Sequence, residues 1–152
     1  MDKTIIARNP AEMEDIGIGI AEGLVSGILV SLVGPLGSGK TTLAKGIAKG
    51  LLVTDIVASP SYLLARTYTG RLALHHIDAY RISSLAELAE VGLDAYLPPE
   101  DGVSVVEWPE RIAGLVELSD VHVRIELLEE DVRRVHVTRR EEASHLRVRE
   151  RP

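Results

Sequence analysis

The residues best suited to chemistry lie in one short stretch, Gly34-Pro-Leu-Gly-Ser-Gly-Lys-Thr-Thr42. This stretch matches the pattern Gly-x-x-x-x-Gly-Lys-Ser/Thr, in which the backbone N–H groups of a loop surround phosphate oxygens. Lys40 is predicted to reach the β- and γ-phosphates of a nucleotide, and it should be exposed when no nucleotide is bound. The hydroxyl of Thr41 is predicted to be a Mg²⁺ ligand. The other residues of the stretch that we expect to bind the nucleotide are Gly37, Ser38, Gly39 and Thr42.

The backbone on either side of this loop has to hold it around an anion. Residues 28–33 are apolar and rich in β-branched side chains, which is typical of a buried strand. Residues 40–50 carry apolar side chains at helical spacing, so the positive N-terminal end of a helix would point at the phosphates. Gly34, Gly37 and Gly39 are expected to supply the backbone angles that turn N–H groups inward. The sequence therefore predicts nucleoside triphosphate binding.

Two carboxylates at the ends of other apolar segments are candidates to complete the site. Glu107 follows residues 103–106, which have the pattern of a strand buried on both faces, and Asp78 ends a second such segment. One acid could hold Mg²⁺ and the other could orient a water molecule, and the sequence leaves open which of them contacts the metal. Each could instead be an ordinary capping or loop carboxylate. With Lys40, these two acids are the predicted catalytic residues.

The remaining chain alternates strand and helix patterns, which is typical of an α/β fold. Asn9, Pro10 and Glu12 form a strong helix start, because they supply an N-cap, a proline at the first helical position and a reciprocal glutamate. Two segments joined through Thr69-Gly70 should pair as a hairpin, so the sheet should contain antiparallel as well as parallel strands. The elements expected from these patterns are strands at residues 3–8, 63–68, 72–78, 103–106, 121–127 and 132–138, and helices at residues 10–24 and 84–91.

Together these elements predict a P-loop NTPase-like three-layer α/β fold with a mixed, parallel and antiparallel, central sheet. A chain of 152 residues with 45% hydrophobic content is long enough to bury one core. We therefore expect a single domain over residues 1–140. The charged segment 141–152 is expected to be a frayed C-terminal tail.

The composition of the chain excludes several classes of protein. There is no cysteine and the histidines are scattered, so we expect no disulfide, no cysteine nucleophile and no protein-ligated zinc site. The net charge of -6 argues against a broad nucleic-acid surface. No apolar segment approaches the roughly 18 residues of a membrane-spanning helix, and no signal-peptide pattern is present. A soluble, cytoplasmic protein that does not contact membranes is therefore expected.

The near absence of asparagine and the absence of glutamine indicate which nucleotide the site binds. Asn9 is the only asparagine and there is no glutamine, so neither a guanine-reading Asn-Lys-x-Asp motif nor a water-positioning glutamine of the Ras type can occur. A conventional GTPase is excluded and ATP is favoured. His75 and His76 are adjacent on a predicted strand, so only one of them can face the site. The arginines that could stabilise a transferred phosphoryl group are Arg66, Arg71, Arg81 and Arg111.

Four ordered blocks carry a resemblance to a known family. They are Gly34-Pro-Leu-Gly-Ser-Gly-Lys-Thr-Thr42, Ser59-Pro-Ser-Tyr62, His76-Ile-Asp-Ala-Tyr-Arg81 and Val106-Glu-Trp-Pro109. Over about residues 10–138 the chain resembles the bacterial TsaE (YjeE) ATPases of tRNA threonylcarbamoyladenosine (t6A) biosynthesis. The resemblance implies an Mg²⁺-dependent ATPase, weak alone, that acts with TsaB and TsaD to support threonylcarbamoyl modification of adenosine 37 in ANN-decoding tRNAs. It implies ATP and ADP as ligands and only indirect contact with tRNA.

The resemblance also assigns roles to individual residues. It implies that Glu107 is a Walker-B-like Mg²⁺ ligand, that Asp78 is a second acid near the metal, and that Ser61 lies on a loop that senses the γ-phosphate. Trp108 would lie beside the nucleotide, although it could instead anchor the core under the last hairpin. Two residues depart from the family pattern: Pro35 replaces a usual acidic residue, and Ser61 replaces a usual threonine. A small-molecule or nucleoside kinase, or a nucleotide-dependent binding module with incidental hydrolysis, stays open as an alternative.

Overall fold

The computed structural model describes residues 2–60 and 64–140 of the chain. In these residues the strands are β1 (Asp2–Ala7), β2 (Leu29–Val33), β3 (Ala65–Tyr68), β4 (Leu74–Asp78), β5 (Val103–Glu107), β6 (Val121–Leu127) and β7 (Arg133–Arg139). The α-helices are α1 (Pro10–Glu22), α2 (Lys40–Gly50), α3 (Leu85–Glu90) and α4 (Leu115–Leu118). Two short 3-10 helices are η1 (Leu93–Ala95) and η2 (Pro109–Arg111).

All the strands belong to one sheet with the order β1-β7-β6-β2-β5-β4-β3. The central strand β2 pairs in parallel with β5 and β6, and β4 pairs in parallel with β5. The pairs β1–β7, β6–β7 and β3–β4 are antiparallel, so the predicted mixed sheet is confirmed. Because β2, β4 and β5 run in the same direction, their carboxyl ends meet at one edge of the sheet.

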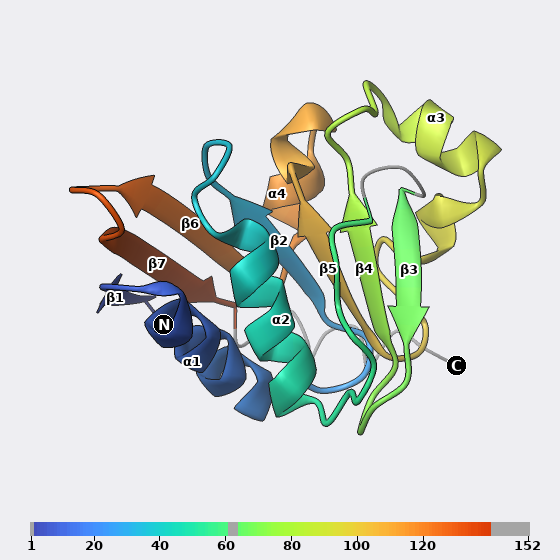
Figure 1. The fold of residues 1–152 in the computed structure, drawn as a ribbon. Coiled ribbons are helices and arrows are strands. Elements are labelled where there is room, and N and C mark those ends of the chain that lie inside the picture. Colours follow the sequence, from blue (N-terminus) through green and yellow to red (C-terminus); the bar gives the residue numbers. More distant parts are fainter. Residues whose placement is uncertain (1, 61–63, 141–152) are drawn as a thin grey trace.

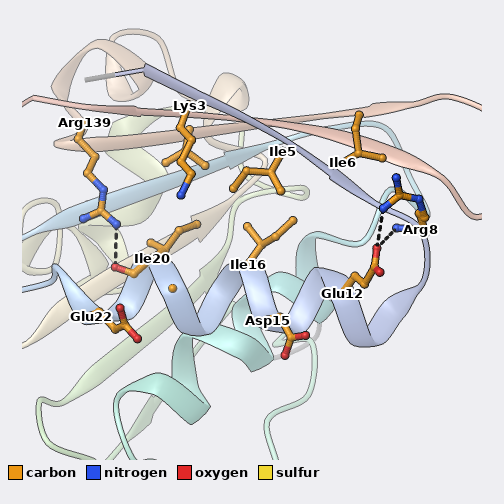
Figure 2. A pocket seen from close by; sticks show the side chains of 12 residues that line it. Lys3, Ile5, Ile6, Arg8, Glu12, Asp15, Ile16, Ile20, Glu22 and Arg139 are labelled. Carbon is orange, nitrogen blue, oxygen red and sulfur yellow. Dashed lines mark hydrogen bonds and ion pairs between the residues drawn. The ribbon is translucent and has the colours of Figure 1, made fainter.

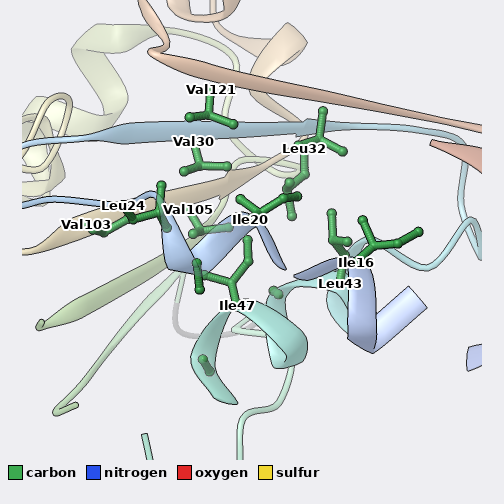
Figure 3. Close-up of a cluster of buried hydrophobic side chains, with 14 of the residues drawn as sticks. Ile16, Ile20, Leu24, Val30, Leu32, Leu43, Ile47, Val103, Val105 and Val121 are labelled. Atoms are coloured by element: carbon green, nitrogen blue, oxygen red, sulfur yellow. The ribbon is translucent and has the colours of Figure 1, made fainter. Parts of the chain in front are cut away.

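Helices cover both faces of this sheet (Figure 1). The helices α1 and α2 lie on one face, where a large apolar cluster joins Leu43 and Ile47 of α2 to Val30 and Val105 of the strands (Figure 3). A smaller apolar cluster on the opposite face includes Leu88 of α3 and Leu115 of α4 with the strand residues Leu29, Ile77 and Val106. The three-layer fold is confirmed, and its second helical layer is built from short helices. None of the helices in the described residues is long and apolar enough to cross a membrane.

The helix starts agree with the sequence. The Asn9 side chain accepts a hydrogen bond from Glu12 N at 2.8 Å, and the Glu12 carboxylate accepts one from Arg8 N at 2.8 Å. The same arrangement starts α3, where Ser84 Oγ accepts from Glu87 N at 3.2 Å. These caps satisfy backbone N–H groups that have no partner inside a helix.

The predicted hairpin exists, but its connection is longer than the expected Thr69-Gly70 turn. Strand β3 ends at Tyr68 and β4 begins only at Leu74. Arg71 accounts for the difference, because its backbone N donates to Leu51 O at 2.5 Å and its side chain donates to Ala21 O at 3.0 Å. These bonds to the ends of α2 and α1 hold the connection away from the ladder. The predicted tail, residues 141–152, lies outside the described residues.

Candidate functional site

The loop between β2 and α2 has the geometry of an anion cradle. Gly37 and Gly39 adopt positive φ angles of 76° and 106°, and α2 begins directly at Lys40. Both angles favour glycine, and the positive end of the α2 dipole lies at the loop. The expectation for Gly34 is wrong, since its φ is not positive. A Cβ there would lie 2.5 Å from Ser38 Oγ and 3.1 Å from Ile125 O, so glycine is required at Gly34 for close packing.

A cavity of about 560 Å³ lies over this loop. It is lined by loop and α2 residues, by the ends of β4 and β5, and by the segments that follow them. The lining residues are Leu36, Gly37, Ser38, Gly39, Lys40, Thr41, Thr42, Ser59, Asp78, Tyr80, Arg81, Glu107 and Trp108. The structure therefore brings together all the predicted site residues that it describes. Ser61 lies outside the described residues.

The sequence predicted an exposed Lys40, and this prediction is wrong. Only 5% of this residue is accessible to solvent. Its Nζ donates to Gly34 O at 2.5 Å and to Pro35 O at 3.0 Å, and it lies 4.0 Å from the centre of the Trp108 ring. Burial lowers the pKa of Lys40 below its usual value, and the nearby acids Glu107, Glu110 and Asp78 oppose that shift. The ammonium group of Lys40 is thus held by loop carbonyls.

The two predicted acids end neighbouring strands. Asp78 and Glu107 are register partners at the parallel ends of β4 and β5, and both are at most 5% exposed. Thr41 Oγ1 donates to the Glu107 carboxylate, at 3.1 Å from each oxygen. Asp78 Oδ1 accepts a hydrogen bond from Tyr80 N at 2.9 Å. The hydroxyl at the start of α2 and the carboxylate at the end of β5 are therefore already in contact.

These oxygens fit a magnesium ion that arrives with a nucleotide. Hydroxyl and carboxylate oxygens are the ligands that Mg²⁺ prefers, and it usually keeps several waters and uses substrate phosphates as well. Within residues 2–60 and 64–140, no group of three or more His, Asp or Glu side chains could enclose a metal ion by itself. Thr41 and Glu107 would therefore supply only part of the coordination shell, and Asp78 lies beside Glu107 as its register partner.

Trp108 lies beside the loop as the resemblance implies, and the apolar cluster that it packs against contains no residue of the last hairpin, β6–β7. It lines the cavity, and its ring also packs against the smaller apolar cluster. Tyr80 meets the Trp108 ring edge-on at 5.0 Å, and Arg111 lies 4.8 Å from the centre of the Tyr80 ring. The Trp108 backbone adopts a positive φ of 60°, which is unusual for a bulky residue and tends to occur at functional sites.

Sequence patterns did not predict that some distant residues, such as Arg133, contact the loop. Arg133 of β7 donates to Ser38 O at 3.3 Å and to Gly37 O at 3.5 Å, across 95 positions of sequence. It also lines a smaller cavity of about 130 Å³ that shares Thr42 and the loop glycines with the large one and reaches Asn9, Met13 and Asp131. Among the four arginine candidates, Arg81 alone lines the large cavity.

A second large hollow lies elsewhere, between α1 and the sheet edge formed by β1 and β7 (Figure 2). Its volume is about 500 Å³, and its apolar part includes Ile5, Ile16 and Ile20. Arg8 and Glu12 at its rim form an ion pair of 3.8 Å with each other. None of the predicted site residues lines this groove, so it is separate from the phosphate loop.

The phosphate loop, the mixed sheet and the paired acids at the strand ends define a P-loop NTPase-like α/β protein. Residues 7–137 match the family described as "Threonylcarbamoyl adenosine biosynthesis protein TsaE". The chain therefore belongs to the TsaE family, which confirms the resemblance seen in the sequence.

Individual relatives agree with this assignment. The chain is 36% identical over 122 residues to "tRNA threonylcarbamoyladenosine biosynthesis protein TsaE" of Treponema pallidum (strain Nichols), covering 80% of this chain and 88% of the relative. It is 36% identical over 131 residues to the protein of the same name from Bacillus subtilis (strain 168), covering 86% and 81%. The crystal structure of Bacillus subtilis YdiB superposes with a TM-score of 0.74 at 30% identity, covering 98% of this chain and 93% of YdiB.

Proposed function

We propose that this protein is an Mg²⁺-dependent ATPase required for threonylcarbamoyl modification of adenosine 37 in ANN-decoding tRNAs, and that it acts with TsaB and TsaD. The observation that carries the proposal is the meeting of Lys40, Thr41, Asp78 and Glu107 at one cavity over the loop. The names of the relatives support a role in tRNA threonylcarbamoyladenosine biosynthesis. The net charge of -6 suits indirect rather than broad direct contact with tRNA.

Each of these residues has a distinct role in the proposed reaction. Lys40 leaves the carbonyls of Gly34 and Pro35 and donates instead to the β- and γ-phosphates, which accept a charge-assisted hydrogen bond more strongly than a neutral carbonyl does. Thr41 and Glu107 would hold Mg²⁺, which when bound would supply positive charge beside the phosphate oxygens. Asp78, beside Glu107, orients the attacking water and accepts its proton.

The smaller cavity is the proposed place of the adenosine part. It shares Gly37, Gly39 and Thr42 with the large cavity, so a ligand whose phosphates occupy the loop can extend directly into it. Asn9 and Asp131 offer polar groups there, and Met13 offers an apolar surface for a flat ring.

The test of this function is ATP turnover by the purified protein, alone and with TsaB and TsaD. We expect slow turnover alone and acceleration by the partners, and no turnover by the Lys40→Ala variant. Rapid, partner-independent phosphorylation of a metabolite would instead identify a kinase.

A Glu107→Ala variant that still binds ATP separates hydrolysis from binding. Loss of tRNA modification in cells carrying this variant is the result that we expect. Full retention of modification would show that nucleotide binding is sufficient and that hydrolysis is incidental.

A further inference from the structure

A histidine is buried directly behind the carboxylate of Glu107. His76 of β4 is 0% exposed, and its Nε2 lies 2.6 Å from Glu107 Oε2. On the other side of the same carboxylate, Thr41 Oγ1 is 3.1 Å from both oxygens. The Glu107 carboxylate is therefore held between an imidazole on a strand and a hydroxyl on a helix.

The contacts of His76 indicate which ring nitrogen donates to Glu107. Its Nδ1 is buried and has no hydrogen-bond partner in the part of the chain that the structure describes. A proton on Nε2 can be donated to Glu107, and it leaves Nδ1 as a bare acceptor. The Nε2–H group is therefore the donor of the 2.6 Å hydrogen bond to Glu107 Oε2.

We propose that His76 is a positioning residue for Glu107. Its Nε2–H holds the carboxylate next to the Thr41 hydroxyl, so that the two oxygen ligands are in place before Mg²⁺ binds. Such partners of metal ligands typically change metal affinity or activity by roughly 10- to 100-fold when removed. This inference rests on the proposed function, because it requires that Glu107 binds Mg²⁺ together with a nucleotide.

The neighbouring His75 is a natural control. It points to the opposite face of β4, where Thr67 Oγ1 lies 3.0 Å from its Nδ1 and Asp101 O lies 3.0 Å from its Nε2. Its ring also stacks on Tyr96 at 4.4 Å. His75 is thus a buried histidine of the same strand with no contact to Glu107.

The experiment measures ADP binding by calorimetry over a range of Mg²⁺ concentrations. For His76→Leu we expect the affinity for ADP without metal to stay within about twofold of wild type. We also expect this variant to need roughly 10- to 100-fold more Mg²⁺ than wild type for the same increase in ADP affinity. His76→Gln places an amide N–H where Nε2 was and should recover most of the Mg²⁺ response. His76→Asn is too short to reach Oε2 and should behave like His76→Leu. The His75→Gln control should match wild type.

The outcomes separate this inference from the function on which it rests. A wild-type Mg²⁺ response in both His76→Leu and His76→Asn would overturn the positioning role. Equal loss of metal-free ADP affinity in all three His76 variants would also overturn it, because a purely structural residue acts in that way. If His76→Leu does not fold, the comparison of His76→Gln with His76→Asn decides. Failure of the wild-type protein to bind ADP would overturn the nucleotide site itself.

Discussion

Two hollows of similar size, the cavity over the phosphate loop and the groove beside α1, differ in what surrounds them. At the loop, Lys40, Asp78 and Glu107 are each at most 5% exposed. Around the groove, charged side chains such as Lys3 and Asp15 are exposed (Figure 2). Burying a charge costs free energy unless a partner compensates it, so buried charges that converge on one space indicate a site.

The size of a hollow is therefore a poor guide to function here. The groove of about 500 Å³ results from packing a helix under the edge of a sheet, and Gly19 on α1 leaves open space beside it. The cavity of about 560 Å³ lies where parallel strands end and a helix begins. Only the second place combines a glycine-rich loop at a helix start with a buried lysine and buried carboxylates. The predictions below test this difference.

The largest effect is expected from the acid that should orient water. Asp78→Asn should lower ATP turnover in the presence of TsaB and TsaD by roughly 100-fold or more, because the amide cannot accept the proton. ADP affinity should stay close to wild type in a calorimetric titration. Asp15→Asn, the matched change in the groove, should leave turnover unchanged. Equal losses in the two variants would contradict the distinction between the two hollows.

On nucleotide binding, a smaller effect is expected from the loop lysine. Lys40→Ala should weaken ADP binding by roughly 10- to 100-fold, since a hydrogen bond from a charged group contributes about 1.5–3 kcal/mol. The melting temperature without nucleotide should also fall by a few degrees, because two hydrogen bonds to loop carbonyls are lost. Lys3→Ala in the groove is the control. Unchanged ADP affinity in Lys40→Ala would remove this lysine from the site.

Two glycine substitutions should change stability in opposite directions. Gly34→Ala should lower the free energy of unfolding by about 1–3 kcal/mol, because its Cβ would meet Ser38 Oγ and Ile125 O. Gly19→Ala should raise it by about 0.5–1 kcal/mol, since a Cβ at this helical position meets nothing within 4 Å. Urea unfolding measures both, and destabilisation by Gly19→Ala would mean that the groove is not open space.

The smallest expected effect is a change in the fluorescence of Trp108. Trp108 is the only tryptophan, and the ammonium of Lys40 lies 4.0 Å from the centre of its ring. ADP should draw Lys40 away and change the emission of Trp108. The Lys3→Ala variant should show the same change as wild type. No change in wild type would leave Trp108 as a core residue only.

Local patterns predicted much of this molecule. The phosphate loop, the strand before it, the helix after it and the cap at Asn9 depend on residues within a few positions of one another. For the same reason the sequence identified Asp78 and Glu107, since each directly ends an apolar strand. The four ordered blocks then led to the family.

Local sequence patterns could not predict contacts between segments that are distant in the chain. The sequence showed that only one of His75 and His76 can face the site, but only the pairing of β4 with β5 put His76 against Glu107. Arg133 reaches the loop because β7 lies near it in space. Lys40 is buried because Trp108 and the loop carbonyls close around it.

By itself, then, the sequence determined that the chain has a phosphate loop in a mixed α/β sheet, because loop geometry and strand burial follow from neighbouring residues. The tertiary structure alone decided which groups surround Glu107, how Lys40 is held and which hollow carries buried charge. Those features depend on distances between segments far apart in the chain, which a local sequence pattern does not predict.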